Sequence, residues 1–435
     1  MDGGMDHEVD VADKTVRDQY EAYPYPARDP GDEARRLITG SPSHILEIEH
    51  FVLRGGRAGD LRALVAGGGT GDGAIMLAQQ LADRETGSVT YLDMSSASLA
   101  IAQARAEARG LLNITFHQGS LLDLPVMAAE RGWAPFDYID CCGVLHHLAD
   151  PGAGLAALVS VLAPGGGLGL MVYGELGRTG VYPAQRAIAR LGGPGPAGGG
   201  PADERLALAR KLTAALPDGN WLKRNDYVVD HLAGDDAGFH DLLLHSRDRA
   251  YLVGEVVALM NGAHLRISGF LPAGAYQPSS YLDDQDLIRR AAALAPEDQW
   301  ALAEELSGAL KTHAFYAIRN DDNNRGAAKG FEPHMVPVLR DMAPGRLAAS
   351  LSKSPGMNAT LGGVTRRFEV SADAPAIIAL IDGKRTLRQI HGRWRAQMTK
   401  QQKKIAWPEF QEEFSALFDI LHPLNMLLFA GAILD

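Results

Sequence analysis

The chain reads Leu61-Arg-Ala-Leu-Val-Ala-Gly-Gly-Gly-Thr-Gly-Asp-Gly73, an apolar run that passes directly into a glycine-rich turn. This pattern predicts a buried strand, a tight turn and then a helix. Glycines at 67, 69 and 71 let the backbone turn sharply and approach a ligand closely, because glycine has no Cβ. Asp93 closes the next apolar strand, where a carboxylate can accept hydrogen bonds from ribose hydroxyls. The sequence therefore predicts a site for a nucleoside-containing cofactor.

Composition limits the possible classes of protein. The chain has 435 residues, which favours two or three domains, and a formal net charge of −11, which argues against a general polyanion binder. Its only cysteines, Cys141 and Cys142, are adjacent and cannot close a long-loop disulfide, as expected in a reducing compartment. The acidic N-terminus is unlike a secretory signal, and no apolar run of about 20 residues is present. We expect a cytoplasmic protein with no membrane partner.

Short apolar strands alternate with helical segments from about residue 44 to 173. This alternation predicts an α/β fold, a Rossmann-like, doubly wound and mostly parallel sheet with helices on both faces. Helices are expected to begin near Gly73, Ser96 and Gly152. The expected strands are Leu61–Val65, Ser88–Asp93, Ile114–Gln118, Phe136–Cys141 and Gly167–Tyr173, with two later ones at Leu265–Phe270 and His313–Arg319.

The chain divides into three expected parts. Residues 1–43 form an N-terminal cover segment, and residues 44–320 form the α/β domain, with a substrate-region insertion at 174–263. The polar segment Asn320–Gly330 is predicted to be an interdomain linker. Residues 331–435 are predicted to form a smaller, mostly helical domain.

The glycine turn alone leaves the cofactor open, since Gly69–Ala74 also fits the G-x-G-x-x-A pattern of nicotinamide-binding proteins. The segments Phe136–Pro151 and Ala163–Leu170 resemble class I S-adenosylmethionine-dependent methyltransferases, as does the late strand His313–Arg319, which is antiparallel in that family. The resemblance covers roughly residues 44–320. It implies a methyltransferase with S-adenosylmethionine as cofactor, bound at the carboxyl ends of the first four strands.

The resemblance also implies roles for individual residues. Glycines of the turn would pack against the amino-acid part of the cofactor, Asp93 would bind the ribose, and Met94 would pack on the adenine. Ser120 stands where the family usually places an acid or polar residue that reads the adenine amino group. The residues expected to bind the cofactor are Tyr23, Gly67, Gly69, Thr70, Gly71, Asp93, Met94, Gly119, Ser120, Leu121, Gly143 and Val144.

Two positions depart from the family pattern. The family often has an acid where this chain has Val65, so the contact to the cofactor's amino group must come from elsewhere; Asp72 could supply it. An aspartate is commoner than a serine at the position of Ser120, which weakens the adenine contact.

Several of these residues also have a purely structural interpretation. The glycine turn could serve only to pack a helix on a sheet, and Asp93 could be a helix N-cap. His146 and His147 could be bases, but in this family such a pair more often shapes the loop beside the cofactor. The two cysteines are expected to be small buried hydrophobes, and no Cys/His spacing typical of a metal site is present.

The N-terminal segment contains three tyrosines, Tyr20, Tyr23 and Tyr25, in a sequence similar to the N-terminal cover of several methyltransferases. Aromatic faces attract cations, so these rings could roof a sulfonium. The alternative is a hydrophobic anchor that ties the N-terminus to the domain.

Residues 173–183 and 239–251 are expected to form the acceptor pocket. A hydroxyl, amine or amide acceptor must lose a proton, and His245 or Asp248 could act as the general base, with Tyr251 beside them. The alternative is a structural Arg/Asp network that orders the loop. No metal ion is expected at the site.

The C-terminal region looks faintly like a peptide-recognition winged-helix domain, on the rhythm of residues 376–390. From Lys384 to Lys404 it carries eight Lys or Arg residues, no acid, and Trp394. This basic segment could meet RNA, an acidic peptide or an acidic partner, or it could be a solvated helix face.

The sequence thus predicts a methyltransferase that acts on an oxygen or nitrogen acceptor of a small molecule, peptide or protein. Three alternatives remain open: an inactive methyltransferase-like scaffold, a nicotinamide oxidoreductase, and an RNA methyltransferase that uses the basic C-terminal region. The acceptor stays unidentified, and a homo-oligomer is possible.

Overall fold

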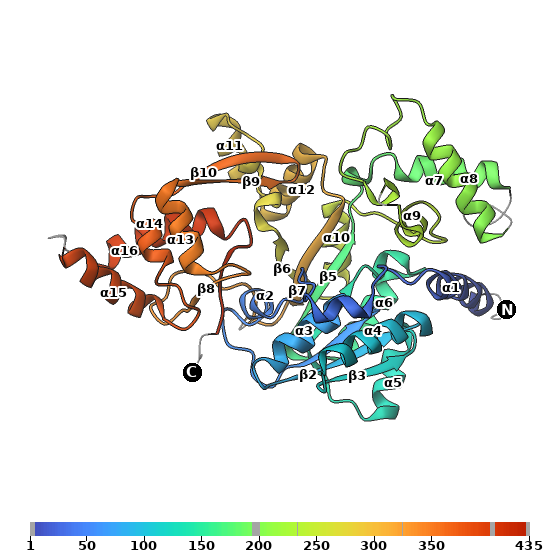
Figure 1. Ribbon diagram of the computed structural model, residues 1–435, viewed down its shortest axis with the longest axis horizontal. Coiled ribbons are helices and arrows are strands. Elements are labelled where there is room, and N and C mark those ends of the chain that lie inside the picture. The colour runs from blue at the N-terminus through green and yellow to red at the C-terminus, as the bar shows by residue number, and fades with distance from the viewer. Residues whose placement is uncertain (1–4, 194–200, 233, 324, 401–404, 432–435) are drawn as a thin grey trace.

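The computed structural model describes residues 5–193, 201–232, 234–323, 325–400 and 405–431. Its centre is a seven-stranded sheet with strand order β3-β2-β1-β4-β5-β7-β6 (Figure 1). The first five strands are parallel, and β7 runs antiparallel to both β5 and β6. The strands are β1 (Arg62–Ala66), β2 (Ser88–Asp93), β3 (Ile114–Gln118), β4 (Phe136–Cys142), β5 (Leu162–Tyr173), β6 (Leu265–Leu271) and β7 (Thr312–Arg319).

Helices cover both faces of this sheet and bury its alternating side chains. On one face pack α2 (Ile45–Phe51), α3 (Asp72–Ala82) and α4 (Ser96–Arg109), which share a core with Ala63 and Val65 of β1. The other face carries α5 (Leu124–Arg131), α6 (Pro151–Ser160), α10 (Val253–Gly262) and α12 (Pro296–Ser307), packed on Leu64 and Ala66. The fold is the three-layer, doubly wound architecture that the alternation predicts, with the expected antiparallel late strand.

Each expected strand is present, and most of the strand ends lie within one or two residues of the predicted positions. The exception is β5, which begins at Leu162 rather than Gly167, because Phe136 of β4 pairs with Leu162 before the ladder shifts register and resumes at Tyr138 and Gly167. Helix α4 begins at Ser96 as expected, and the hydroxyl of Ser95 caps it by accepting a hydrogen bond from the amide of Ser98.

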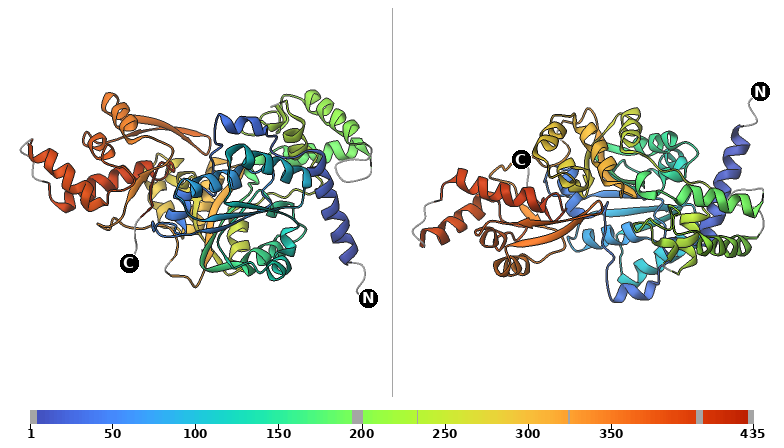
Figure 2. Two further views of the ribbon diagram at one scale, coloured as in Figure 1. Left: turned by 60° about the horizontal axis from the view of Figure 1, so that its bottom comes forward. Right: turned by 90° about the horizontal axis from the view of Figure 1, so that it is seen from above.

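A helical lobe lies beside the carboxyl ends of the strands. It contains α7 (Val181–Gly192), α8 (Ala202–Ala215) and α9 (Asp236–Leu243), which share a small apolar core. Helix α1 (Met5–Ala22) lies at the same end of the molecule, and the C-terminal region lies at the opposite end (Figures 1 and 2). No described helix is long and apolar enough to span a bilayer.

Among its described residues, the C-terminal region contains four helices and two small antiparallel sheets, with α11 (Gln285–Ala292) preceding it in the chain. Its helices are α13 (Pro344–Lys353), α14 (Ala374–Ile378), α15 (Leu387–Lys400) and α16 (Trp407–Leu421). Its strands are β8 (Pro337–Leu339), β9 (Gly356–Leu361), β10 (Val364–Glu369) and β11 (Leu427–Phe429). The region is mostly helical, as expected; its likeness to a winged helix stays a prediction.

This region is joined to the α/β domain by buried polar contacts. The guanidinium of Arg340 pairs with the carboxylate of Glu47 on α2, and the Glu47 side chain is 0% exposed. The amide of Phe429 on β11 donates to Nδ1 of His50 at 3.0 Å, and the neighbouring Leu428 packs into the core of the α/β domain. The proposed boundary at 320–330 therefore separates two parts with an extensive shared contact.

Trp394, which the sequence placed within the basic segment 384–404, is 1% exposed and belongs to the apolar core of the C-terminal region. It is therefore not presented to a partner. Lys403 and Lys404, the last cations of that segment, lie outside the described residues.

Candidate functional site

A cavity of about 360 Å³ lies at the carboxyl ends of β1, β2, β4 and β5, where the strand order reverses between β1 and β4. Ligands of doubly wound α/β folds bind at such a crevice. Side chains from α1, from the loops after the strands and from α9 complete its wall. The cavity thus occupies the place that the glycine turn predicts for a cofactor.

The glycine turn is shaped by close packing. Gly67 has φ of +78°, and a Cβ there would lie 2.4 Å from Cγ2 of Val144. Gly69 has φ of +52°, and a Cβ there would lie 2.8 Å from the carbonyl oxygen of Tyr25. Larger residues at these two positions would strain the backbone and push away the cavity walls.

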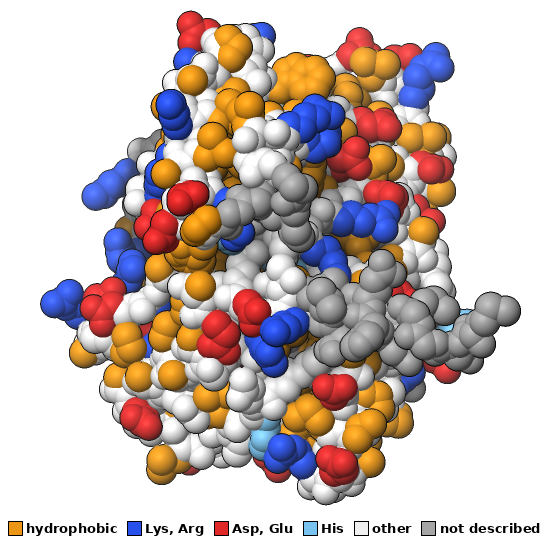
Figure 3. All heavy atoms as spheres, turned by 90° about the vertical axis from the view of Figure 1, so that its right-hand side faces the viewer, with side chains coloured by type: hydrophobic (Ala, Val, Ile, Leu, Met, Phe, Trp, Pro, Cys, Tyr) orange, Lys and Arg blue, Asp and Glu red, His pale blue; other side chains and the backbone are white. Residues whose placement is uncertain are grey.

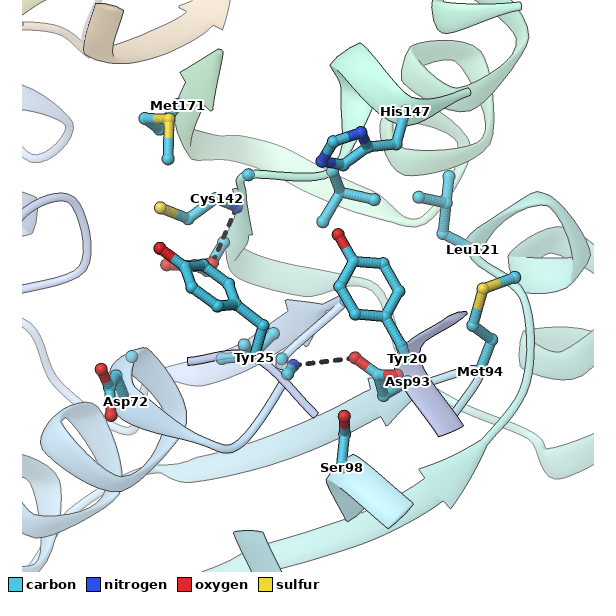
Figure 4. Close-up of a pocket in the computed structure, with 18 of the residues that line it drawn as sticks. Tyr20, Tyr25, Asp72, Asp93, Met94, Ser98, Leu121, Cys142, His147 and Met171 are labelled. Atoms are coloured by element: carbon cyan, nitrogen blue, oxygen red, sulfur yellow. Dashed lines mark hydrogen bonds between the residues drawn. The ribbon is translucent and has the colours of Figure 1, made fainter. Parts of the chain in front are cut away.

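Asp93 lies at the end of β2 and holds the turn in place. Its Oδ2 accepts a hydrogen bond from the amide of Gly69 at 2.8 Å (Figure 4). Its Oδ1 accepts one from the amide of Ser95, also at 2.8 Å. The residue is 9% exposed, and burial raises the pKa of its carboxyl above the ordinary value. Each oxygen keeps a lone pair that can accept from a ligand hydroxyl.

Nine of the twelve residues expected to bind the cofactor line this cavity: Gly67, Gly69, Asp93, Met94, Gly119, Ser120, Leu121, Gly143 and Val144. The other three, Tyr23, Thr70 and Gly71, are not among the lining residues. Thr70 donates its hydroxyl to the carbonyl of Pro26 at 2.6 Å, and Gly71 is the N-cap of α3. Tyr23 stacks on His240, with ring centroids 4.7 Å apart.

The N-terminal segment contributes two aromatic walls, because Tyr20 and Tyr25 both line the cavity. In Figure 4 the Tyr20 ring stands between Asp93 and His147, with its hydroxyl toward His147. The two interpretations of the tyrosines thus divide: Tyr20 and Tyr25 face the cavity, whereas Tyr23 packs outside it as an anchor.

Three contacts tether this segment to the α/β domain. Arg28 forms a salt bridge to Asp72 at 2.6 Å, Thr70 bonds to Pro26, and the hydroxyl of Ser95 donates to the carbonyl of Tyr20 at 3.2 Å. The segment therefore covers the cavity as a fixed roof.

A buried polar cluster closes the far end of the cavity. His147, Asp241 and His245 each bring one nitrogen or oxygen to within 4.8 Å of the others. Asp241 accepts hydrogen bonds from the hydroxyls of Tyr20 at 3.2 Å and Tyr173 at 2.8 Å. Burial raises the pKa of Asp241, and His147 opposes that shift.

The hydrogen bonds of this cluster define where its protons lie. His245 Nδ1 accepts from the amide of Arg247 at 3.0 Å, so in the neutral ring Nε2 carries the proton, 3.2 Å from the Tyr20 hydroxyl. His147 Nδ1 faces the carbonyl oxygen of Arg247 at 2.8 Å and must donate to it. The neutral His147 ring therefore has its lone pair on Nε2, and His147 lines the cavity.

The same assignment argues against a metal centre. A metal needs the lone pair of His245 Nε2, but the Arg247 amide already occupies Nδ1 and fixes the proton on Nε2. Both oxygens of Asp241 also accept from tyrosines. These donors fit a hydrogen-bond network better than a metal site.

The three residues expected to be catalytic lie at different distances from the cavity. His245 belongs to the cluster and contacts Tyr20. Asp248 forms a buried ion pair with Arg178 at 2.9 Å, and Arg178 stacks on the ring of Tyr173 at 3.7 Å, so Asp248 lies behind the cavity wall. Tyr251 is 2% exposed, and its amide donates to the carbonyl of Tyr173 at 2.8 Å.

Sequence reasoning missed Asp241, and it favoured a loop-shaping role for His147. Asp241 lies on α9 four residues before His245, which follows the end of that helix, and this closeness in sequence could have drawn attention to it. Asp140, a buried acid that also lines the cavity, was missed too.

Comparison with known proteins adds to this geometry. Residues 64–168 match a family model described as a methyltransferase domain. An uncharacterized protein of Synechococcus sp. is 33% identical over 314 residues, which cover 72% of this chain and 73% of that protein. A tRNA 5-carboxymethoxyuridine methyltransferase of Escherichia coli is 37% identical over 118 residues, 27% of this chain and 42% of that enzyme.

Among solved structures, PKMT2 of Rickettsia typhi has the same fold, with a TM-score of 0.59 and 14% identity, over 90% of this chain and 75% of that one. The structure of PKMT2 in complex with AdoHcy superposes with a TM-score of 0.57 and 15% identity, covering 95% of this chain and 76% of the other. The chain belongs to the class I S-adenosylmethionine-dependent methyltransferases. The cofactor of this methyltransferase is S-adenosylmethionine.

Proposed function

We propose that the cavity holds S-adenosylmethionine with its adenosine at Asp93 and its methyl group directed at the cluster of Tyr20, His147 and Asp241. The observation that carries this proposal is that one continuous cavity is lined by Asp93 at one end and by His147 and Asp241 at the other. The acceptor is a nucleophilic oxygen or nitrogen that enters beside the cluster.

The residues present fit this cofactor. Asp93 offers two half-used carboxylate oxygens to a vicinal diol, while Met94 and Leu121 give apolar surface for the adenine ring. Ser120 lines the cavity, but its hydroxyl already accepts from the amide of Leu122 at 3.2 Å and keeps one donor free. Tyr20 and Tyr25 supply aromatic surface that attracts a cation such as a sulfonium.

The bound cofactor supplies an electrophilic methyl group, so the protein has to hold the acceptor in line and remove its proton. Within the cluster at the far end, His147 lines the cavity, and its Nε2 keeps a lone pair because Nδ1 donates to the Arg247 carbonyl. We assign it as the general base, with Asp241 and Tyr20 holding the acceptor beside it. His245, expected from the sequence to be the base, then orients Tyr20 by donating from Nε2.

Asp248 and Tyr251 act in this proposal as positioning residues. Asp248 fixes Arg178, whose guanidinium packs on the face of Tyr173, and Tyr173 in turn donates to Asp241. Tyr251 joins its backbone to that of Tyr173 beyond the end of β5.

A peptide or protein acceptor is favoured by the surface of the helical lobe. Leu191, Trp221 and Leu232 are 63%, 65% and 72% exposed, and Tyr227 and Val229 are 44% and 46% exposed. Figure 3 shows the face of this lobe and of α1, where hydrophobic side chains lie among charges of both signs. A protein acceptor that covers these side chains would remove their apolar surface from water.

An RNA acceptor remains the second candidate, on the strength of the basic segment 384–404. Our proposal places the methyltransferase in the cytoplasm, since Cys141 and Cys142 are both free thiols.

Two measurements test the proposal. Isothermal calorimetry with AdoHcy should give a dissociation constant in the micromolar range, and the variant Asp93→Asn should bind more weakly. Incubation with labelled S-adenosylmethionine and an extract from a strain that lacks this protein should then place the label in protein. Label in RNA would favour the second candidate, and the absence of AdoHcy binding would contradict the site.

A further inference from the structure

The end of β1 lacks the acid that many members of the family carry there, and the structure places a carboxylate directly beside the gap. Val65 of β1 is the register partner of Asp140 on the adjacent parallel strand β4. Residues in register on adjacent strands point to the same face of a sheet. Both residues line the cavity.

Asp140 is built as a buried acceptor. It is 3% exposed, its Oδ1 accepts from the amide of Cys142 at 3.2 Å, and its Oδ2 accepts from the hydroxyl of Ser43. The hydrogen bond from Cys142 is drawn in Figure 4, where Tyr25 and Cys142 face the same part of the cavity. Burial raises the pKa of this carboxyl to about 6.

The carboxylate of Asp140 has no cationic partner in the described part of the chain. Within the described residues, no Lys, Arg or His side chain forms an ion pair with it. A buried carboxylate without a cation is costly, and a cationic ligand would remove that cost. The site therefore offers an uncompensated negative charge to a cationic ligand.

The three other carboxylates that line the cavity are occupied. Asp72, which the sequence suggested for this task, forms salt bridges to Arg28 at 2.6 Å and to Arg105 at 2.7 Å. Asp93 holds the glycine turn at the ribose end. Asp241 accepts from two tyrosine hydroxyls at the far end.

We infer that Asp140 binds the ammonium group of the amino-acid portion of S-adenosylmethionine, replacing from β4 the acid that β1 lacks. The inference rests on the proposed cofactor site. It assigns to one buried carboxylate the recognition of a cation that AdoHcy carries and that 5′-methylthioadenosine lacks.

Calorimetry with these two ligands tests the inference. The variant Asp140→Asn keeps the size and the hydrogen-bond acceptor but removes the charge, and it should bind AdoHcy about 10- to 100-fold more weakly. Its affinity for 5′-methylthioadenosine should stay within about twofold of that of the unmodified protein. The matched control Ser43→Ala removes a hydrogen-bond donor that lowers the pKa of Asp140 but keeps the carboxylate. Measured at pH 8.5, where the carboxyl is ionised, it should bind AdoHcy within about threefold of the unmodified protein.

Each other outcome overturns a defined claim. Unchanged AdoHcy affinity of Asp140→Asn, or an equal loss for both ligands, would overturn the ammonium assignment while leaving the cofactor site intact. An unmodified protein that binds neither ligand would overturn the cofactor site and this inference together. A thermal unfolding transition of the free variant establishes that Asp140→Asn is folded.

Discussion

Tyr20 and Asp241 lie 221 positions apart in the chain, yet the hydroxyl of Tyr20 donates to Oδ1 of Asp241 at 3.2 Å. This contact joins the N-terminal helix to the helical lobe across the end of the cavity. The N-terminal segment and the proposed acceptor site are therefore directly connected. A substitution in that segment should alter activity at the acceptor site.

The variant Tyr20→Phe keeps the aromatic wall and removes the donor to Asp241. We expect AdoHcy affinity within about threefold of the unmodified protein and kcat lowered about 10-fold or more, the effect of one hydrogen bond to a charged group. Calorimetry and a steady-state assay give the two values. Tyr23→Phe is the matched control, because Tyr23 packs on His240 outside the cavity; an equal loss in both variants would contradict the assignment.

His147→Asn tests the general base. An asparagine amide can still donate to the Arg247 carbonyl, but the lone pair of Nε2 is lost. We expect kcat to fall by about 10²- to 10⁴-fold, the usual contribution of a general base. AdoHcy binding should be nearly unchanged, and Tyr251→Phe should retain most of its activity. Full turnover by His147→Asn would contradict the general-base assignment and would mean that methyl transfer depends on proximity alone.

Asp93→Asn weakens two interactions at once, since Asp93 holds the amide of Gly69 and is the proposed ribose ligand. We expect AdoHcy to bind about 1.5–3 kcal/mol less tightly. Unlike Asp140→Asn, this variant should lose affinity for 5′-methylthioadenosine by a similar amount. A selective loss for AdoHcy alone would place Asp93 at the amino-acid end instead.

Asp140→Asn should make the free methyltransferase more stable at neutral pH. Burial raises the pKa of Asp140 in the folded state to about 6, above its ordinary value of 3.8, so the folded state binds the proton more tightly. Ionisation of this group thus destabilises the fold progressively as pH rises from about 4 to 6, by about 2–3 kcal/mol in all. Above pH 6 the full cost is present, and the variant should show the higher Tm.

The gain in Tm should be largest at pH 7.5 and should shrink to about half at pH 5, as seen by calorimetric or fluorescence melting. A variant that is less stable at both pH values would show that the charge of Asp140 is compensated in the free protein.

The contact between Glu47 and Arg340 offers a test of how the C-terminal region is held. Arg340→Met removes the cation from a carboxylate that is 0% exposed, and breaking such a buried pair typically costs about 3–5 kcal/mol. The donors Tyr316 and Asn425 remain on Glu47 and should soften the loss. The double variant Glu47→Gln with Arg340→Met should recover part of the stability; a double variant no better than the single one would rule out an unpaired charge as the cause.

The sequence predicted the sheet, and it predicted the glycine turn with Asp93 beside it, because both depend on local patterns. The strand at 62–66 runs directly into the glycine turn, and Asp93 ends the next strand. Each of these features can be predicted from a window of about ten residues. Resemblance to a family added the residues after β3 and β4, such as Ser120 and Val144, which line the cavity.

The polar cluster at the far end of the cavity could not be predicted from local sequence patterns. His147, Asp241 and Tyr20 meet only because the sheet order and the lobe bring α1, α9 and the loop after β4 together. Asp248 had the more suggestive neighbours in sequence, but its charge is used by Arg178. Asp140 could be recognised only through its register with Val65, which requires the pairing of β1 with β4.

The tethered N-terminal segment bears on how the cofactor enters and leaves the cavity. The hydrogen bonds from Thr70 to Pro26 and from Ser95 to Tyr20, together with the Arg28–Asp72 bridge, hold the N-terminal segment over the cavity. If the spent cofactor leaves past this segment, these contacts must break first, and such lid motions commonly limit turnover. We therefore expect a first round of transfer in rapid mixing that outpaces the steady rate, and a steady rate that speeds up when the latch at Arg28 is removed.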